Sequence, residues 1–250
     1  MGRGGKPLPG AAAGRLTPWG GSVSLNRTLA EGTANERGDM KIVQLLVGQM
    51  AVFAYLVGCE QTGQALVIDP AGEEDRIVAE ARRQGLEIVL IVNTHGHPDH
   101  TCGNARMKEL TGAPIVVHAA DAAGMVSPAA QDFARMLGCA GTPPPDRTVE
   151  DGDLLQVGRE VSLQVISTPG HTPGSICLYT PGHVFTGDTL FVGGVGRTDL
   201  PGGSWPTMLR SIQERILTLP DDTIVWPGHH YGPKPNSTVR RERETNPFLR

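Results

Sequence analysis

The stretch that decides the fold is Thr94-His95-Gly96-His97-Pro98-Asp99-His100. It follows an apolar, β-branched run over residues 88–92, which is typical of a buried strand. Gly96 and Pro98 then predict a loop, which places the polar side chains at the carboxyl end of that strand. Sites in α/β sheets are usually built at this end of the strands. The sequence therefore predicts an α/β fold with a functional site in this loop.

Three imidazoles and one carboxylate within six residues form a ligand set that zinc, iron and manganese accept. The spacing lets His95 and His97 turn to one side while Asp99 and His100 turn to the other. That arrangement favours two adjacent metal ions over one. The alternative is a solvated polar loop that is rich in histidine. It is disfavoured because this stretch holds three of the eight histidines in the chain.

The composition indicates a loop-rich globular enzyme. The 250 residues include 33 Gly and 20 Pro, and 39% are hydrophobic and 19% charged. A formal net charge of −4 gives no reason to expect nucleic acid or an anionic membrane as a partner. No apolar run approaches the roughly eighteen residues that a membrane-spanning helix needs. We therefore expect a small-molecule substrate, with neither nucleic acid nor membrane as partner.

The four cysteines, at positions 59, 102, 139 and 177, are far apart and form no C-x-x-C pair. A disulfide framework and a thiolate zinc site are therefore not expected. Cys102 lies close to the histidine stretch, and we interpret it as a small buried residue, with a supporting role behind the ligands as the alternative. This cysteine pattern favours a reducing compartment, so the expected location is cytoplasmic.

Residues 1–39 differ in character from the rest of the chain. They are rich in Gly, Pro, Ala, Ser and Thr with scattered Arg, and they have no sustained periodicity. We expect a disordered extension. The apolar run at residues 11–13 is too short for a signal peptide, and the arginines only weakly favour an organelle-targeting leader. Met40 immediately precedes the first regular strand and is a candidate for the native start.

From residue 40 onward the chain has regular patterns of strands and helices. Strands are predicted over residues 41–47, 52–57, 65–68, 88–93, 113–117, 154–155, 160–166, 175–179, 183–185 and 223–226. Helices are predicted over residues 73–85, 103–110, 129–137 and 206–217. The chain thus contains two halves, each with several strands and with helices between them. Two packed sheets with helices on their outer faces would account for this order. No linker interrupts the pattern, so residues 40–250 are expected to form one domain.

Three further motifs each follow a predicted strand. They place His171 in the turn 168–174, Asp188 in residues 185–189 and His229 in residues 226–231. A single residue of this kind is more often a turn or capping residue. Together with the first loop, however, there are four such loops at the carboxyl ends of strands. This recurrence predicts one convergent site.

The order of these motifs resembles the signature of the metallo-β-lactamase superfamily, over residues 41–249. The resemblance implies an αββα four-layer sandwich with two divalent metal ions at one edge, Zn²⁺ in the first place with iron or manganese as alternatives. It implies that His95, His97 and His171 bind the first metal, that Asp99, His100 and His229 bind the second, and that Asp188 bridges both. A bridging Asp is typical of the two-metal hydrolases and unlike the true β-lactamases, so antibiotic hydrolysis is not expected.

Within the superfamily, residues 94–100, 170–175 and 186–190 resemble the glyoxalase II (hydroxyacylglutathione hydrolase) group. The resemblance implies hydrolysis of a thioester, such as a hydroxyacylglutathione, by a hydroxide that bridges two metals. Metal binding lowers the pKa of water from about 15.7 towards about 7. Asp99 would orient the hydroxide and accept its proton. The leaving thiolate, with a parent pKa of about 8.5, needs no strong general acid.

Two departures from the long glyoxalase II enzymes favour a short bacterial relative. Only about twenty residues follow His229, where the long enzymes carry a helical region that helps to bind glutathione. Residues 194–199 and 237–247 resemble the short relatives and the persulfide dioxygenases instead. A persulfide dioxygenase, with one iron at His95, His171 and Asp188, is therefore the alternative. Residues 71–74 and the glycine and proline within the histidine stretch favour the hydrolase, and the complete ligand set disfavours a non-catalytic metal-binding scaffold.

Three residues are candidates for substrate contacts. Arg197 can meet a substrate carboxylate, although pairing with Asp199 to fix the loop is the favoured interpretation. Tyr231 and Lys234 follow the last ligand and could line the pocket, where Lys234 would hold an anionic group or remain solvated. A homo-oligomer is compatible with the sequence.

Overall fold

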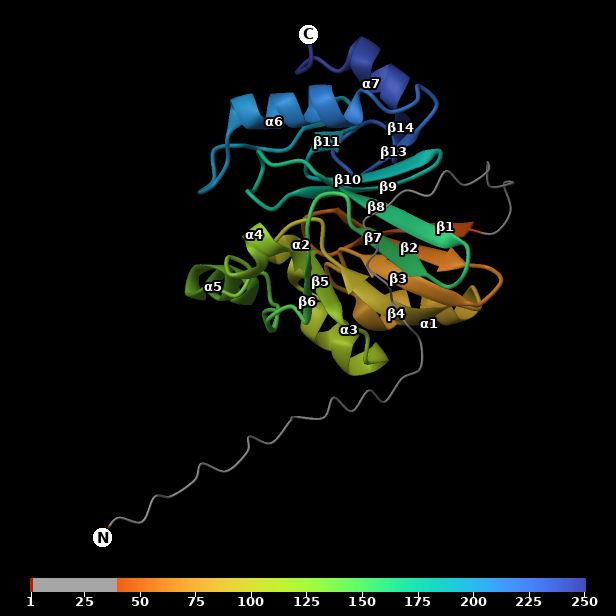
Figure 1. Ribbon diagram of the computed structural model, residues 1–250, viewed down its shortest axis with the longest axis vertical. Coiled ribbons are helices and arrows are strands. Elements are labelled where there is room, and N and C mark those ends of the chain that lie inside the picture. Colours follow the sequence, from red (N-terminus) through yellow and green to blue (C-terminus); the bar gives the residue numbers. More distant parts are fainter. Residues whose placement is uncertain (2–39) are drawn as a thin grey trace.

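The protein is described here by a computed structural model that covers Met1 and residues 40–250. Two six-stranded β-sheets pack face to face, and helices cover the outer face of each sheet (Figure 1). The predicted αββα four-layer sandwich is confirmed. The predicted extension at residues 1–39 lies, apart from Met1, outside the described residues and stays a prediction.

The first sheet has the strand order β1-β2-β3-β4-β5-β6. Its strands are β1 (Met40–Val47), β2 (Val52–Cys59), β3 (Gln64–Ile68), β4 (Glu87–Val92), β5 (Ile115–His118) and β6 (Arg147–Val149). The first three strands run antiparallel, and β3 to β6 run parallel. Parallel neighbours need crossover connections, which contain α1 (Glu74–Arg83), α3 (Asn104–Thr111) and α5 (Pro128–Met136).

The second sheet has the order β14-β13-β10-β9-β8-β7. Its strands are β7 (Leu154–Val157), β8 (Val161–Ser167), β9 (Ile176–Thr180), β10 (His183–Gly187), β13 (Ile224–Pro227) and β14 (Ser237–Thr238). Its outer face is covered by α6 (Trp205–Ser211), the π-helical turn η1 (Ile212–Ile216) and α7 (Val239–Thr245). A small hairpin of β11 (Leu190–Phe191) and β12 (Gly194–Val195) lies beside this sheet.

Three hydrophobic clusters fill the spaces between the four layers. Strand β2 shows how the sequence divides between two of them, because successive side chains of a strand point to opposite faces. Tyr55 and Val57 lie in the central cluster between the sheets, whereas Ala54 and Leu56 pack under the helices of the first outer layer. The third cluster lies between the second sheet and the α6–α7 layer. The burial of apolar surface on both faces of each sheet thus fixes the layer order.

The histidine stretch differs from the prediction in one respect. Its second half is not a loop but the short helix α2 (Pro98–Thr101). Pro98 stands at the start of this helix, where a missing N–H costs nothing, and Asp99 occupies its first turn. A second short helix, α4 (Ala119–Ala122), was not predicted, because one turn of helix carries too few residues to show a period.

The cysteines also differ from the prediction. Cys102 and Cys139 form a disulfide, with their Cα atoms 5.5 Å apart. The interpretation of Cys102 as an unpaired buried residue is therefore wrong. The pairing was hidden in the sequence because the two residues are 37 positions apart and meet only when the end of α5 folds beside α2. Cys59 and Cys177 are free and buried. The argument from the cysteines for a reducing compartment therefore loses its basis.

Over the part of the chain that the structure describes, none of the helices combines the length and the apolar character needed to cross a membrane.

Candidate metal centre

The seven residues predicted as metal ligands lie together where the loops of the two sheets meet. Four of them follow β4, in the loop at residues 93–97 and in α2, and the other three follow β8, β10 and β13. Their side chains form three groups in which the ligand atoms lie within 4.8 Å of one another. The groups are His95–His97–His171, His95–His100–Asp188 and Asp99–His100–His229.

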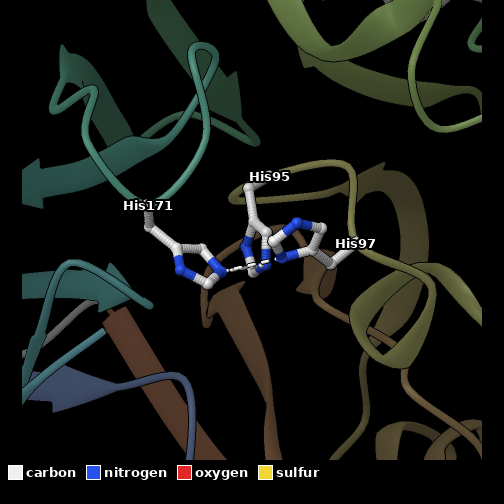
Figure 2. A group of neighbouring side chains, drawn as sticks. All are labelled: His95, His97 and His171. Carbon is white, nitrogen blue, oxygen red and sulfur yellow. Dashed lines mark hydrogen bonds between the residues drawn. The ribbon is translucent and has the colours of Figure 1, made fainter. Parts of the chain in front are cut away.

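The first group consists of three imidazoles whose nitrogens point towards one another (Figure 2). His97 Nδ1 lies 2.8 Å from His171 Nε2, which lies 3.2 Å from His95 Nε2. Two nitrogens that each lie 2.0–2.1 Å from one tetrahedral zinc ion are about 3.3 Å apart. The spacing of these nitrogens is therefore close to that of ligands around a shared ion.

Asp99–His100–His229, called the second group from here on, adds a carboxylate to two imidazoles. His100 Nε2 lies 3.0 Å from His229 Nε2, and Asp99 Oδ2 lies 3.4 Å from His229 Nε2. Asp188 lies between the two groups, because its Oδ2 is 3.5 Å from His171 Nε2 and its Oδ1 is 3.3 Å from His100 Nε2. Within the described residues, Asp188 Oδ1 is buried and makes no hydrogen bond. A buried acceptor without a donor is costly in the protein alone, and it suits a cation.

Hydrogen bonds at the ring nitrogens that face away from the candidate metal positions hold three of the imidazoles in place. Three Nδ1 atoms face an oxygen acceptor: His100 at 2.9 Å from Asp69 Oδ2, His171 at 2.7 Å from the Arg197 carbonyl, and His229 at 2.8 Å from the Met50 carbonyl. An acceptor at Nδ1 places the proton there and leaves the Nε2 lone pair free for a metal. In their neutral form, these three rings are thus set in the tautomer that would bind metal through Nε2.

Two rings of the first group, His95 and His97, are neutral in the metal-free protein at neutral pH. Burial first, and the nearby His171 ring second, lower the pKa of His97 to about 4. Burial also holds the pKa of His95 well below its usual value. Metal ions bind imidazole in its neutral form, so these rings need lose no proton at neutral pH.

The second group carries charge instead. Burial disfavours the charged form of His229, but the Asp188 carboxylate outweighs it and raises the pKa of His229 to about 9. The carboxylates of Asp188 and Asp99 likewise raise the pKa of His100 against the effect of burial. In return, the two imidazoles lower the pKa of Asp188 well below its usual value, although burial acts to raise it. Without metal, this group is therefore a set of ion pairs in which protons occupy the positions of cations.

Asp69 supports the site and was not predicted as a site residue. It follows β3, is fully buried, and accepts hydrogen bonds from the Thr94 amide at 2.8 Å and the Thr94 hydroxyl at 2.7 Å. Its Oδ2 also faces His100 Nδ1, so one carboxylate fixes both the start of the histidine stretch and a ligand ring. Its position directly after a strand, like that of Asp188, was a signal in the sequence that could have identified it.

Asp121, on α4, joins two of the ligand loops. Its Oδ2 accepts hydrogen bonds from the Gly96 amide at 2.8 Å and from the Thr172 hydroxyl at 2.7 Å. Its Oδ1 accepts from the Gly174 amide at 2.7 Å. The buried carboxylate thus clamps the loop of His95 and His97 to the loop of His171. No sequence pattern indicated it, because its partners are 25 to 53 positions away.

The three candidate substrate contacts occupy different surroundings. Arg197 is exposed and paired through two 2.8 Å hydrogen bonds with Asp199, which agrees with the favoured loop-fixing interpretation. Tyr231 is 58% exposed, and its ring stacks on that of His229 with centroids 4.4 Å apart. Lys234 is exposed. The structure therefore places Tyr231 against a ligand ring and leaves the Arg197 side chain engaged with Asp199.

A cavity of about 350 Å³ opens beside the second group. Its lining includes Asp99, the turn at residues 48–50, Glu73 and Glu74, and both cysteines of the disulfide. Arg106 is the one basic residue among the described lining residues, and it is already paired with Asp75 and Glu109. The cavity is therefore acidic and gives a small molecule access to Asp99.

Comparisons with known proteins agree with this geometry. Residues 47–229 match the family described as the metallo-beta-lactamase superfamily. The chain is 40% identical over 182 residues to a hydroxyacylglutathione hydrolase of a Polaromonas species, covering 72% of this chain and 62% of that enzyme. It is 34% identical over 209 residues to the mitochondrial persulfide dioxygenase ETHE1 of Bos taurus, covering 82% of this chain and 74% of that enzyme.

Solved structures show the same fold. The BLEG-1 B3 metallo-beta-lactamase superposes with a TM-score of 0.76 at 31% identity, covering 84% of this chain and 99% of that chain. TTHA1623 in a di-iron-bound form superposes with a TM-score of 0.71 at 36% identity, covering 83% of this chain and 100% of that chain.

Proposed function

Because this chain belongs to the metallo-β-lactamase superfamily, we propose that it is a metal-dependent hydrolase that acts on a thioester such as a hydroxyacylglutathione. The observation that carries the proposal is the position of Asp188, whose two oxygens face the two ligand groups. Two complete groups with a carboxylate between them favour a pair of divalent ions, with Zn²⁺ in the first place and iron or manganese as alternatives.

The residues divide between the two ions as their geometry suggests. His95, His97 and His171 would hold the first ion, Asp99, His100 and His229 the second, and Asp188 both. When bound, such ions acidify water and polarise a carbonyl oxygen. The chain itself supplies neutral rings in the first group and a buried acceptor, Asp188 Oδ1, that awaits a cation.

Asp99 is the proposed catalytic residue. His100 and, through a hydrogen bond, His229 lower the pKa of Asp99, although burial acts to raise it, so it is a carboxylate at neutral pH. It lines the cavity through which a substrate would arrive. A carboxylate at this position can orient the attacking water and accept its proton. No acid is needed for the leaving group, since a thiolate of parent pKa about 8.5 leaves unaided.

The proposed substrate is a small thioester whose anionic groups point away from the acidic cavity. Glu73, Glu74 and Asp99 give the cavity lining its negative charge. Any carboxylate of a glutathione moiety would therefore lie outside the cavity, with the sulfur end of the molecule inside it. Tyr231, Lys234 and Arg197 stay predicted substrate contacts.

Persulfide dioxygenation is the second candidate. The persulfide dioxygenase relative supports it, and His95, His171 and Asp188 form a compact set for one iron, with His171 Nε2 at 3.2 Å from His95 and 3.5 Å from Asp188. This candidate needs only that set, whereas the hydrolase needs both groups.

The test combines metal content with two assays. Purified protein is analysed for metal identity and metals per chain, then assayed with a panel of thioesters and with glutathione persulfide in an oxygen electrode. Two metals per chain with thioester turnover support the hydrolase. One iron per chain with oxygen consumption refutes it in favour of the dioxygenase. The variant His229→Ala separates the two again, since it should abolish hydrolysis but leave a single iron in place.

A further inference from the structure

The Cys102–Cys139 disulfide forms part of the wall of the cavity beside Asp99. Both cysteines line this cavity, together with Gly138 and Ala140. None of the reaction steps proposed above uses the disulfide. It is nevertheless the redox-active group nearest in sequence to the ligands, because Cys102 directly follows the helix that carries Asp99 and His100.

The disulfide is the covalent tie between this ligand helix and the segment at residues 137–141, which follows α5. Backbone hydrogen bonds from the Leu137, Gly138 and Cys139 amides hold the segment to the end of α5, with the Cys139 amide 2.9 Å from the Ala134 carbonyl. Three side-chain hydrogen bonds add to these: Gln49 Nε2 to the Leu137 carbonyl at 3.2 Å, Gln131 Nε2 to the Thr142 carbonyl at 2.9 Å, and Asn104 Nδ2 to Thr142 Oγ1 at 2.9 Å. Two of these three act on Thr142, beyond the part that walls the cavity. Without the disulfide, residues 138–140 would still be attached to the end of α5 by the backbone hydrogen bonds, but they would no longer be bound covalently to the ligand helix.

The two cysteines differ in access. Cys102 is buried, at 7% exposure, whereas Cys139 is half-buried and lies between the exposed residues Gly138 and Ala140. Of the two cysteines that line the cavity, Cys139 is therefore the more accessible residue. Attack on a disulfide sulfur depends on such access.

We propose that Cys102–Cys139 is an exchange site for low-molecular-weight thiols that enter the cavity. A thiolate attacks Cys139 Sγ, forms a mixed disulfide with it, and expels the Cys102 thiolate. A second thiolate attacks the mixed disulfide, releases the small-molecule disulfide and leaves Cys139 reduced. Two thiols thus supply the two electrons, and two protons from solution complete the cysteines as thiols. The site does not depend on which reaction the metal centre performs, so it goes beyond the proposed hydrolase.

Exchange at this site would change the cavity wall. Once Cys139 is released from Cys102, residues 137–141 are no longer bound covalently to the ligand helix. We expect the amides of this segment to exchange hydrogen several-fold faster, because local opening is governed by the contacts that remain. The ligand helix itself retains the hydrogen bond from Asn93 Nδ2 to the His100 carbonyl.

The test uses the full chain as purified without reductant, with glutathione as the probe thiol. Thiols are titrated in denaturant before and after exposure of the folded protein, and adducts are located by acid quench and peptide mass mapping. We expect two thiols before, from Cys59 and Cys177, and four after. A glutathione adduct should appear transiently on Cys139. Hydrogen exchange over residues 137–141 gives an independent readout that does not depend on activity.

Two variants define the direction of attack. Cys102→Ser removes the resolving thiol, so glutathione disulfide should form a lasting adduct on Cys139. Cys139→Ser leaves the buried Cys102, which should react at least several-fold more slowly. Cys59→Ala is the matched control, because Cys59 is buried away from the cavity. The Cys102–Cys139 disulfide of this variant should exchange at the unaltered rate.

Three results would overturn the proposal. The first is four free thiols in the unreduced protein, and the second is a disulfide that glutathione reduces only after unfolding. The third is faster adduct formation at Cys102 than at Cys139, which would mean that access does not run through the cavity as described.

Discussion

Asp188 is the residue through which the two ligand groups are joined. Its Oδ2 lies within 3.5 Å of His171 Nε2 and 3.4 Å of His229 Nε2, and its Oδ1 has no hydrogen-bond donor among the described residues. A neutral amide at this position would keep the shape but remove the charge that would balance the two proposed cations.

Asp188→Asn should therefore lower kcat/KM by more than the roughly 10- to 100-fold typical of residues behind a ligand, and should reduce metal content. Steady-state kinetics with the best thioester, together with elemental analysis, measure both effects. Asp132→Asn, on the exposed face of α5, is the matched control and should leave both quantities unchanged. Full activity in Asp188→Asn would contradict the assignment.

The opposite protonation of the two groups predicts how metal binding depends on pH. His229, with a pKa of about 9, must lose its proton to bind metal. The affinity of the second group should therefore rise as the pH increases from neutral towards about 9, with proton release. His97, with a pKa of about 4, and His95, whose pKa is also lowered, already lack the proton, so metal binding at these two rings should release no proton over that range. Calorimetric zinc titrations of the metal-free protein in buffers of different ionisation enthalpy measure the released protons; two events with equal proton release would refute this division.

The same shifts predict the stability of the metal-free protein. The pKa of His229 is about 9 in the folded state and about 6.5 in the unfolded state. The ion pairs of His229 therefore stabilise the folded state fully below a pH of about 6.5, and this contribution is lost as the pH rises through about 9. The lowered pKa of His97 affects stability at acidic pH. Its contribution to the free energy of unfolding is present above the unfolded pKa of about 6.5 and is lost as the pH falls towards about 4. Urea unfolding of the metal-free protein across this range should show a maximum between the two limits, and a monotonic profile would argue against it.

At the scale of elements, the one-turn helix α4 matters because it presents Asp121 to two ligand loops. A Cβ atom on Gly174 would meet the Asp121 carboxyl carbon at 2.6 Å. The side chain there is not a flexible end that can move aside, because three hydrogen bonds hold it. The absence of a side chain at residue 174 is thus a requirement of the clamp.

Gly174→Ala should therefore destabilise the protein by about 1–3 kcal/mol, as overpacking of a tight site does, and should lower metal content. Gly124→Ala, on the connection that carries α4, is the matched control, since its Cβ would meet the Asp121 carbonyl only at an ordinary 3.5 Å. The free energy of unfolding from urea titrations, measured for both variants, decides the matter. Equal stability of the two variants would show that the clamp tolerates a methyl group.

The sequence predicted the structure best where a sustained hydrophobic pattern defines a strand and a His or Asp follows the end of that strand. Most strands and the four longer helices were predicted within a few residues, because their apolar periodicity is sustained. The ligand loops were predicted because each places a His or Asp directly after a strand. Asp121 and the disulfide were not predicted, because their partners are brought together only by the folded chain. The same reason explains α2, whose single turn is fixed by its surroundings rather than by propensity.

At the scale of the whole molecule, the site lies where the two sheets meet, with ligands contributed by both. The first sheet supplies the histidine stretch after β4, and the second supplies His171, Asp188 and His229. The Phe53 amide of β2 also donates a hydrogen bond to the Gly228 carbonyl at 2.8 Å. Bound metal would therefore join the two halves of the sandwich.

Metal removal should accordingly destabilise the entire domain rather than a single loop. A metal present at 1,000 times its Kd stabilises the folded state by about 4 kcal/mol, which corresponds to a fall in Tm of about 10 °C on removal. Thermal unfolding with and without a chelator, followed by restoration of zinc, measures this change. Asp188→Asn is the control, because its smaller metal content should make its Tm nearly insensitive to the chelator. A wild-type Tm that the chelator leaves unchanged would refute the coupling.

The distribution of the ligands along the chain also has a consequence for biosynthesis. The stretch at residues 94–100 leaves the ribosome with three imidazoles and a carboxylate already adjacent, but His171, Asp188 and His229 are synthesised much later. Until residue 229 has emerged, the nascent chain carries a half-site that can hold a metal ion but cannot enclose it. The complete set of candidate ligands therefore exists only after the two halves have docked, so on the proposed function the folded protein, rather than the growing chain, would determine which metal is held.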